Sequence, residues 1–195
     1  MDTRQRIMIE AMNLFSECGY HTTTVDDIAR AAEVAKGTVY WHFASKEGLF
    51  EALLNEMFTR YLDKVLQIRQ GGGPVLEQLH KILELRIALI RDNQPVTEMI
   101  MSQGGKGMSR ESRERFLGWR RRHQEIITEL MWEGKAQGEL QIDAPEVAAI
   151  AFVGVGSELI LSEQIHRPEL ARELMNLLTG GIAGQPPQAK DTRWE

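Results

Sequence analysis

The sequence predicts an all-α protein of about nine helices, with a small N-terminal domain of three helices followed by a larger helical domain. Apolar residues recur every three or four positions along most of the 195 residues. Capping residues precede these segments, and glycine or proline follows them. A third observation is that residues 24–43 have the pattern of two short helices joined by a tight turn.

The composition, with 43% hydrophobic and 26% charged residues, is typical of a soluble globular protein. Residues 1–4 lack the basic and apolar segments of a secretion signal. The most apolar stretch, residues 147–161, is interrupted by glycine, serine and glutamate and is too short to cross a bilayer. We therefore expect a cytoplasmic protein without a membrane partner.

The first two predicted helices occupy residues 3–18 and the segment after Thr24. Gly19 ends the first helix, and Cys18, the only cysteine, is expected to pack in the core. Thr24 and Asp27 have the spacing of a capping box at the start of the second helix. Its apolar stripe is predicted to consist of Ile28, Ala31 and Ala32.

The third predicted helix begins near Lys36 and turns Val39 and Phe43 inward. Its outward face carries one cation, hydroxyls, an imidazole and an indole within about two turns, a set of groups suited to phosphates and base edges. The geometry predicted is a helix-turn-helix. The first 46 residues hold five Lys or Arg and six Asp or Glu, and the net charge is −5. We therefore expect DNA affinity to be modest without specific contacts and to fall steeply with salt.

Ser45 is a predicted N-cap for a long helix that runs to about Arg69 and links the two domains. The run of three glycines and a proline at 71–74 ends it. Residues 75–91 form the next amphipathic helix, 96–101 a shorter one, and 102–109 a loop that either connects helices or gates a cavity.

A long helix with a basic start is predicted at residues 110–137. Seven cations and two acids lie between Lys106 and Arg122. Three interpretations are open for this stretch: a solvated helix face, a site for an anionic ligand, or a second DNA contact. The sequence favours the solvated helix face.

The last two helices are predicted at residues 143–164, with Asp143 as N-cap and Pro145 in the first turn, and at 168–178. Their small residues and surplus apolar surface favour a four-helix dimer interface over a monomer core. Residues 181–195 are expected to be a disordered tail.

Signatures of enzymes are scarce, because the sequence has no phosphate loop, nucleophile elbow or cysteine pair. The Glu-x-x-His units at Glu77–His80 and Glu163–His166 are an exception, since such units bind the metal in di-iron bundles. A helical carrier or di-iron protein without a DNA role is therefore the alternative. We expect no enzyme, metal site or cofactor, because both units lie near helix ends.

The N-terminal quarter resembles the TetR-type (tetracycline-repressor-like) transcriptional regulators. The similarity covers residues 4–55 and includes Thr-Val-Asp-Asp-Ile-Ala, Lys-Gly-Thr-Val-Tyr-Trp-His-Phe and Ser-Lys-Glu-Gly-Leu at 24–29, 36–43 and 45–49. The resemblance implies a ligand-responsive, homodimeric repressor released from a palindromic operator by a small apolar or amphipathic inducer. The Tyr-Trp-His run is similar to that of repressors of multidrug efflux pumps, so control of efflux genes is one expectation.

The resemblance also implies a division of labour along the chain. Residues 1–47 would bind double-stranded DNA, and residues 48–180 would bind the inducer and dimerise through the last two helices. The implied DNA contacts are Thr24, Lys36, Gly37, Thr38, Tyr40, Trp41, His42 and Lys46. The resemblance implies an apolar ligand pocket in the second domain but does not identify its residues. Candidate contacts, chosen from the side chains of that domain, are Leu83, Ile87, Met99, Phe116, Trp119, His123 and Phe152.

Overall fold

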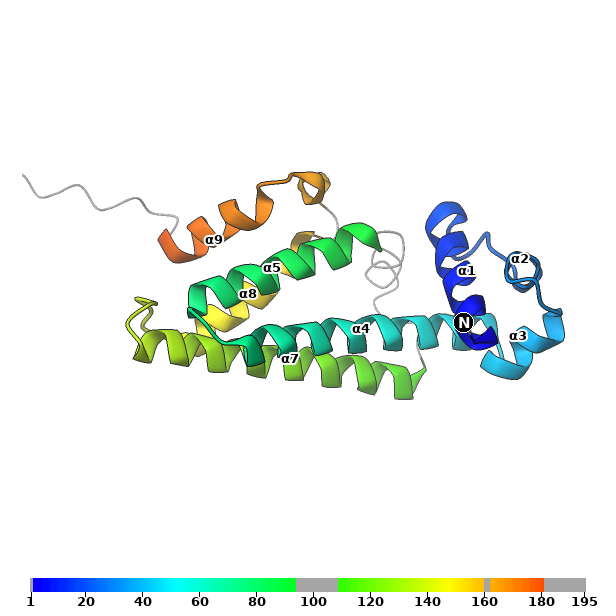
Figure 1. Cartoon of the computed structure of the whole chain (residues 1–195), viewed down its shortest axis with the longest axis horizontal. Coiled ribbons are helices and arrows are strands. Elements are labelled where there is room, and N and C mark those ends of the chain that lie inside the picture. The colour runs from blue at the N-terminus through cyan, green and yellow to red at the C-terminus, as the bar shows by residue number, and fades with distance from the viewer. Residues whose placement is uncertain (1, 94–108, 160–161, 181–195) are drawn as a thin grey trace, which may run out of the picture.

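The computed structural model describes residues 2–93, 109–159 and 162–180, and within them it has eight α-helices, one 3-10 helix and no strand. The prediction of an all-α fold is confirmed. Figure 1 shows two groups of helices joined by the long helix α4 (Lys46–Gly71). None of the described helices is long and apolar enough to span a membrane.

The N-terminal group consists of α1 (Thr3–Cys18), α2 (Val25–Ala31) and α3 (Lys36–Phe43), packed around the start of α4. Asp2 caps α1, and Gly19, at a φ of 82°, ends it as predicted. The core of this group is formed by apolar residues from all four helices, including Ile7, Phe15, Ile28, Val39, Leu49 and Leu54.

Two details of this core differ from the sequence prediction. Cys18 is exposed, because Tyr20 folds back beside Phe15 and fills that end of the core with its ring, 5.2 Å away between centroids. Ala31 is also exposed, and the buried face of α2 instead includes Val25 and Ala29.

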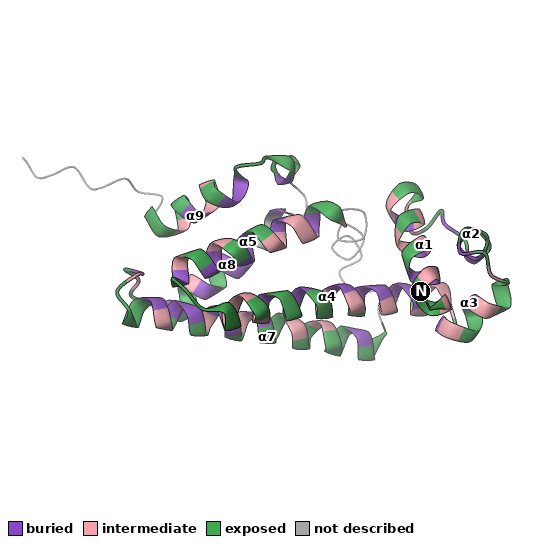
Figure 2. Ribbon diagram, in the orientation of Figure 1, coloured by how far each residue is buried: buried purple, intermediate pink, exposed green. Residues whose placement is uncertain are grey.

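The helix α4 belongs to two hydrophobic cores at once. Its first half, from Leu49 to Met57, is buried in the N-terminal core, whereas Tyr61, Leu62 and Val65 are buried in the second core. At 26 residues the helix is about 39 Å long. The N-terminal core thus continues beyond residue 47, the expected domain limit, and one continuous helix connects both cores (Figure 2).

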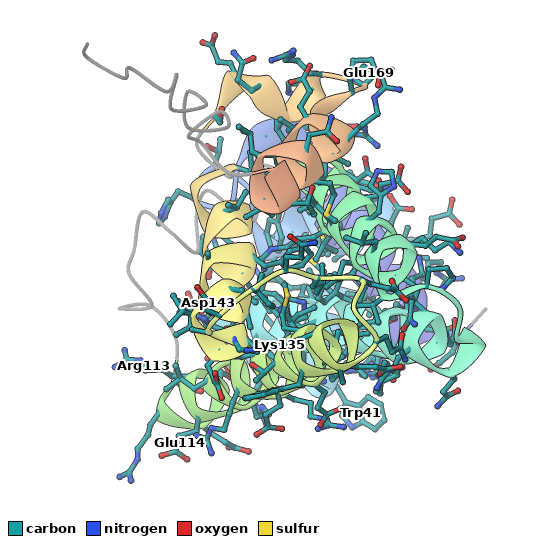
Figure 3. All side chains as sticks on the ribbon, turned by 90° about the vertical axis from the view of Figure 1, so that its left-hand side faces the viewer. Trp41, Arg113, Glu114, Lys135, Asp143 and Glu169 are labelled. Atoms are coloured by element: carbon teal, nitrogen blue, oxygen red, sulfur yellow. The ribbon has the colours of Figure 1, made fainter. Side chains whose placement is uncertain are left out.

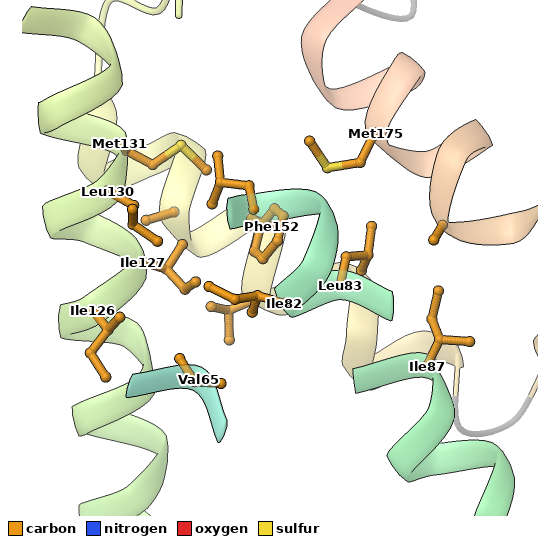
Figure 4. Close-up of a cluster of buried hydrophobic side chains, with 14 of the residues drawn as sticks. Val65, Ile82, Leu83, Ile87, Ile126, Ile127, Leu130, Met131, Phe152 and Met175 are labelled. Carbon is orange, nitrogen blue, oxygen red and sulfur yellow. The ribbon is translucent and has the colours of Figure 1, made fainter. Parts of the chain in front are cut away.

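The second group is a bundle of α4 with α5 (Val75–Asp92), α7 (Arg110–Ala136), α8 (Pro145–Glu158), the 3-10 helix η2 (Glu163–His166) and α9 (Leu170–Gly180). Its core combines aliphatic side chains with Tyr61, Phe152, Met131 and Met175. Figure 4 shows part of this core, including Phe152 and both methionines. The helix expected at 96–101, most of the loop expected at 102–109 and the tail at 181–195 lie outside the described residues.

Glycines allow a chain reversal and a close packing contact in this bundle. Gly72 and Gly73 have φ values of 64° and 92°, so the chain can reverse between α4 and α5. Gly134 lies where α7 meets Val75 and Leu140, and a Cβ there would be 2.6 Å from the Leu140 side chain. A larger residue at position 134 would require the Leu140 side chain to move.

The predicted start and end of α8 are wrong. The N-cap is Ala144, not Asp143, because the residue before a proline is held in an extended conformation and Pro145 occupies the first helical position. The Asp143 backbone carbonyl accepts a hydrogen bond of 2.8 Å from Lys135 (Figure 3). The helix ends at Glu158 and not near residue 164, since Ser162 caps the separate helix η2.

Candidate nucleic-acid interface

The outer surface of α3 is the most exposed group of large side chains in the N-terminal domain. Val39 and Phe43 anchor the helix in the core with 1% and 7% exposure. On the opposite side Tyr40 is 43% exposed and Trp41 80% exposed. Trp41 projects away from the body of the molecule (Figure 3). An indole and a phenol held this far from the core are available to a partner, as the sequence predicted.

At the start of α3, Lys36 contacts the neighbouring helix. Its ammonium lies 2.6 Å from the Asp26 carboxylate, and both side chains are about half exposed. The hydrogen bond to Asp26 raises the pKa of Lys36. Such exposed ion pairs are weak, so a phosphate could take the place of Asp26 at small cost. Gly37 beside it is exposed, with open space where a Cβ would lie.

The other predicted DNA contacts are held more closely by the protein. Thr24 caps α2 through its hydroxyl, and the predicted capping box with Asp27 is confirmed. Its hydroxyl and backbone N–H both donate to the Asp27 carboxylate and lower the pKa of that group. Thr38 and His42 are partly buried. The structure therefore gathers seven of the eight expected residues at the outer ends and faces of α2 and α3.

Lys46 is the exception. Its ammonium donates hydrogen bonds to the backbone carbonyls of Tyr20 and Thr23, at 2.9 and 3.0 Å, and lies 4.4 Å from the centre of the Tyr20 ring. In this position Lys46 joins the start of α4 to the loop between α1 and α2. The sequence alone could not indicate these carbonyl partners, because they lie more than twenty residues away.

The turn between α3 and α4 fixes the direction of the exposed helix. Ala44 adopts a φ of 61°, and Ser45 caps α4 by accepting a hydrogen bond from the Gly48 N–H at 2.9 Å. A Cβ on Gly48 would lie 2.1 Å from the Phe43 carbonyl oxygen. Only glycine therefore allows the last turn of α3 to approach α4 so closely.

The seven residues expected to bind a ligand divide into two groups. Phe116, Trp119 and His123 lie along α7, where Phe58 of α4 stacks on Trp119 with 5.2 Å between ring centroids. Leu83, Ile87 and Phe152 are buried in the core of the second bundle (Figure 4). Met99 lies outside the described residues.

Sequence analysis missed two members of a buried polar cluster around His123. A hydrogen bond of 2.9 Å joins His123 Nε2 to the hydroxyl of Tyr61 on α4. Burial raises the pKa of Tyr61 to about 12, and burial together with the guanidinium of Arg86 lowers the pKa of His123 to about 3. The imidazole is thus neutral at physiological pH. Tyr61 and Arg86 occupy positions that continue the apolar stripes of their helices. Helical spacing alone therefore does not distinguish them from ordinary core residues.

A cleft of about 490 Å³ opens between α1, α4 and α5, away from the expected ligand residues. Its floor is formed by buried or partly buried apolar side chains and its rim by charged ones. The lining residues are Gln5, Met8, Ile9 and Met12 of α1, Leu53, Glu56, Met57, Arg60, Tyr61 and Lys64 of α4, and Leu85, Ala88, Leu89, Asp92 and Asn93 at the end of α5. No local pattern indicates this cleft, because three separate helices supply its walls.

The two Glu-x-x-His units are on the surface. Glu77 pairs with Lys81 at 2.7 Å, and His80 lies 3.7 Å from Glu84. Glu163 and His166 are exposed on η2. Within the described ranges, no three His, Cys, Asp or Glu side chains are grouped so that they could hold a metal ion.

Two family models match the sequence. One, described as bacterial regulatory proteins of the tetR family, covers residues 7–53, and the other, the tetracyclin repressor-like C-terminal domain, covers residues 72–160. The chain belongs to the TetR family. A transcriptional regulator of the TetR/AcrR family from Thermobifida fusca has the same fold, with a TM-score of 0.80, 28% identity and coverage of 94% of this chain and 100% of that one.

Two relatives with named regulatory roles match only part of the chain. The transcriptional regulator AcrR of Shigella flexneri is 39% identical over 84 residues, 42% of this chain and 39% of that protein. The negative regulator of the icaADBC biofilm operon, IcaR of Staphylococcus aureus, is 37% identical over 68 residues, 35% of this chain and 36% of that protein. Each match thus spans little more than a third of the relative's length.

Three arginines of the basic stretch of this TetR protein form ion pairs along their own helix. In the described part, Arg110 pairs with Glu114 at 2.9 Å, Arg115 with Glu111 at 2.8 Å and Arg122 with Glu125 at 3.2 Å. These pairs are exposed and join side chains three or four residues apart. They favour a solvated helix face over a site for an anion.

Proposed function

We propose that the protein is a homodimeric repressor that binds a palindromic operator through α3 and leaves it when a small apolar or amphipathic inducer binds. The observation that carries the proposal is the exposed face of α3, with Tyr40 and Trp41 turned outward on a helix anchored by Val39 and Phe43. Its action on DNA places the protein in the cytoplasm. The relative IcaR, a negative regulator, supports repression.

In this proposal Lys36, Gly37 and Thr38 meet base edges or nearby phosphates at the front of α3. Tyr40, Trp41 and His42 contact the backbone along the same helix, and Thr24 does so from the start of α2. Lys46 contributes by holding the loop at Tyr20 and Thr23 in place, or reaches a phosphate by releasing the two carbonyls. Control of efflux genes rests only on the resemblance of the Tyr-Trp-His run.

The exposed apolar face of α8 supports dimerisation. Val147 and Ile150 are 63% and 62% exposed, and Leu177 of α9 is 52% exposed. The exposed Ala151 and Gly154 are small enough for the backbone of a partner helix to approach. Two copies of α8 and α9 would bury this surface in a four-helix bundle.

Sedimentation of wild type, Ile150→Glu and Ile9→Glu tests the interface. Ile9 on α1 is a matched control, because it is an isoleucine with 46% exposure far along the chain from α8. We expect Ile150→Glu to be monomeric and Ile9→Glu to be dimeric. Dimers of unchanged affinity in both variants would exclude the α8 face.

A dimer reads a palindrome when its two recognition helices lie about one duplex turn, ~34 Å, apart. An inducer lowers DNA affinity to the extent that it prefers a conformation with another spacing. Helix α4 is the element able to transmit this change, since its two halves are packed in different cores.

Selection of bound sequences from random duplex DNA tests the DNA-binding role directly. We expect a palindromic consensus for wild type and for the control Leu117→Ala, an exposed apolar residue of α7. Tyr40→Ala and Lys36→Ala should lose the consensus while remaining folded dimers. A folded wild-type dimer that enriches no sequence at low salt would contradict the proposal and favour a helical carrier.

A further inference from the structure

The cleft between α1, α4 and α5 has the dimensions and lining of a ligand site. Its volume of about 490 Å³ lies within the range of pockets for small organic molecules. Its floor contains Met8, Leu53 and Met57, all at most 8% exposed, and Met12 is added from α1. Thioether side chains adapt to ligands of different shape and contact aromatic rings favourably. The floor therefore suits an apolar, preferably aromatic, body.

The charges at the rim indicate the sign of the polar group. The Glu56 carboxylate pairs with Arg60 one turn along α4, and Asp92 pairs with Arg91 at 3.3 Å. Among the described residues, Lys64 has no ion-pair partner. The acidic groups of the rim are therefore compensated, whereas one ammonium remains available for an anion.

The walls of the cleft belong to different cores. Met8 on α1 is part of the N-terminal core, and Ile87 and Ile90 of α5 are part of the second core. Leu89 of α5 lines the cleft and packs against both cores. Any rotation of the DNA-binding helices relative to α5 would change the width of the cleft. A molecule that fills the cleft therefore binds one relative orientation better than another.

We propose that this cleft binds an amphipathic organic anion, with its apolar body on the methionine floor and its anionic group at Lys64, and that binding changes operator affinity. The proposal rests on the proposed function for its regulatory part only. It places the regulatory ligand between the domains, instead of among Phe116, Trp119, His123 and the core residues expected from the sequence.

The probe for the test is 1-anilinonaphthalene-8-sulfonate, which has an aromatic body, carries a sulfonate and fluoresces when desolvated. Fluorescence titration of the full-length dimer gives its affinity. Ala88→Phe fills the cleft, since Ala88 lines it and is only partly buried. Lys64→Glu reverses the charge at the rim. Lys81→Glu on α5 is the matched control, because Lys81 is exposed and outside the cleft.

We expect binding at least about tenfold weaker in Ala88→Phe and several-fold weaker in Lys64→Glu, with Lys81→Glu equal to wild type. Circular dichroism and thermal unfolding check that each variant is folded. If Ala88→Phe does not fold, the result for Lys64→Glu decides, because Lys64 is exposed and its substitution leaves the core intact. Equal affinity in all four proteins, or no fluorescence gain with wild type, would overturn the site.

Fluorescence anisotropy of the selected duplex then tests regulation. The probe should weaken operator binding by wild type and by Lys81→Glu, and have a smaller effect on Lys64→Glu. Probe bound in the cleft with unchanged operator affinity would overturn the regulatory part. A protein that binds the probe but no duplex would contradict the proposed DNA role and leave the site established, so the two failures are distinguishable.

Discussion

Replacing Gly48 by alanine should disrupt the link between the recognition helix and α4. The added Cβ would lie 2.1 Å from the carbonyl oxygen of Phe43, whereas real Cβ contacts essentially never fall below 3.0 Å. The oxygen must therefore move by at least about 0.9 Å. Because this atom belongs to the backbone at the last residue of α3, the whole end of the recognition helix must shift.

The energetic effect combines two opposing terms. Overpacking a tight contact costs about 3 kcal/mol at the upper end of its usual range, and alanine stabilises a helix by about 1 kcal/mol relative to glycine. The net loss of about 2 kcal/mol predicts a Tm lower by roughly 4–8 °C for a chain of this size. Operator affinity should fall further, at least about tenfold, because the surviving folded protein presents a displaced α3.

Thermal unfolding and anisotropy titration of the selected duplex measure the two effects. Gly118→Ala on α7 is the control, because its Cβ would meet nothing within 4 Å. That variant should be more stable by about 0.5–1 kcal/mol and bind DNA normally. A Gly48→Ala protein with the Tm and operator affinity of wild type would refute the proposed packing of the turn.

Three further predictions concern the second bundle and its contact with α4. Tyr61→Phe should lower the free energy of unfolding in urea by about 1–3 kcal/mol, because His123 Nε2 loses its buried partner; equal stability would show that the bond is absent. Below pH 6.5 the imidazole of His123 gains a proton only on unfolding, because its pKa in the folded protein is about 3. The free energy of unfolding of wild type should therefore fall by about 1.4 kcal/mol per pH unit between pH 6 and 5. The free energy of unfolding of His123→Gln should fall less over the same range. Glu51→Gln should lower the free energy of unfolding by roughly 1 kcal/mol near neutral pH. The reason is that the Glu51 carboxylate accepts hydrogen bonds from the Ser109 N–H and hydroxyl at 2.7 and 3.2 Å. Because the pKa of Glu51 is lowered in the folded protein, this difference from wild type should shrink as acid protonates the carboxylate.

Local patterns in the sequence were sufficient to predict most helices. The capping box at Thr24, the cap at Ser45 and the break after Gly71 depend on neighbours within four residues, and the structure confirms all three. The predicted start of α8 is wrong by one residue. Asp143 is of a residue type that often caps helices, but Pro145 holds Ala144 in the capping position.

The features that periodicity could not reveal depend on contacts between distant segments. Lys46 donates to the carbonyls of Tyr20 and Thr23, which only the tertiary fold brings near it. The same holds for the pairing of Tyr61 with His123 across 62 residues. Side chains that line the interdomain cleft follow the same helical spacing as core residues, so their role is visible only once the helices are packed.

The spacing of the two recognition helices is the measurement that tests the account most directly. A spin label attached at Ala31→Cys would report this spacing, in a chain whose single native cysteine is replaced by Cys18→Ser. Ala31 is suitable because it is exposed at the end of α2, a helix that shares the N-terminal core with α3. Pulsed electron resonance would compare the operator-bound dimer with the dimer saturated with 1-anilinonaphthalene-8-sulfonate. We predict two distinct label distances. Identical distances in the two states would contradict the proposal that a ligand releases DNA by moving α3.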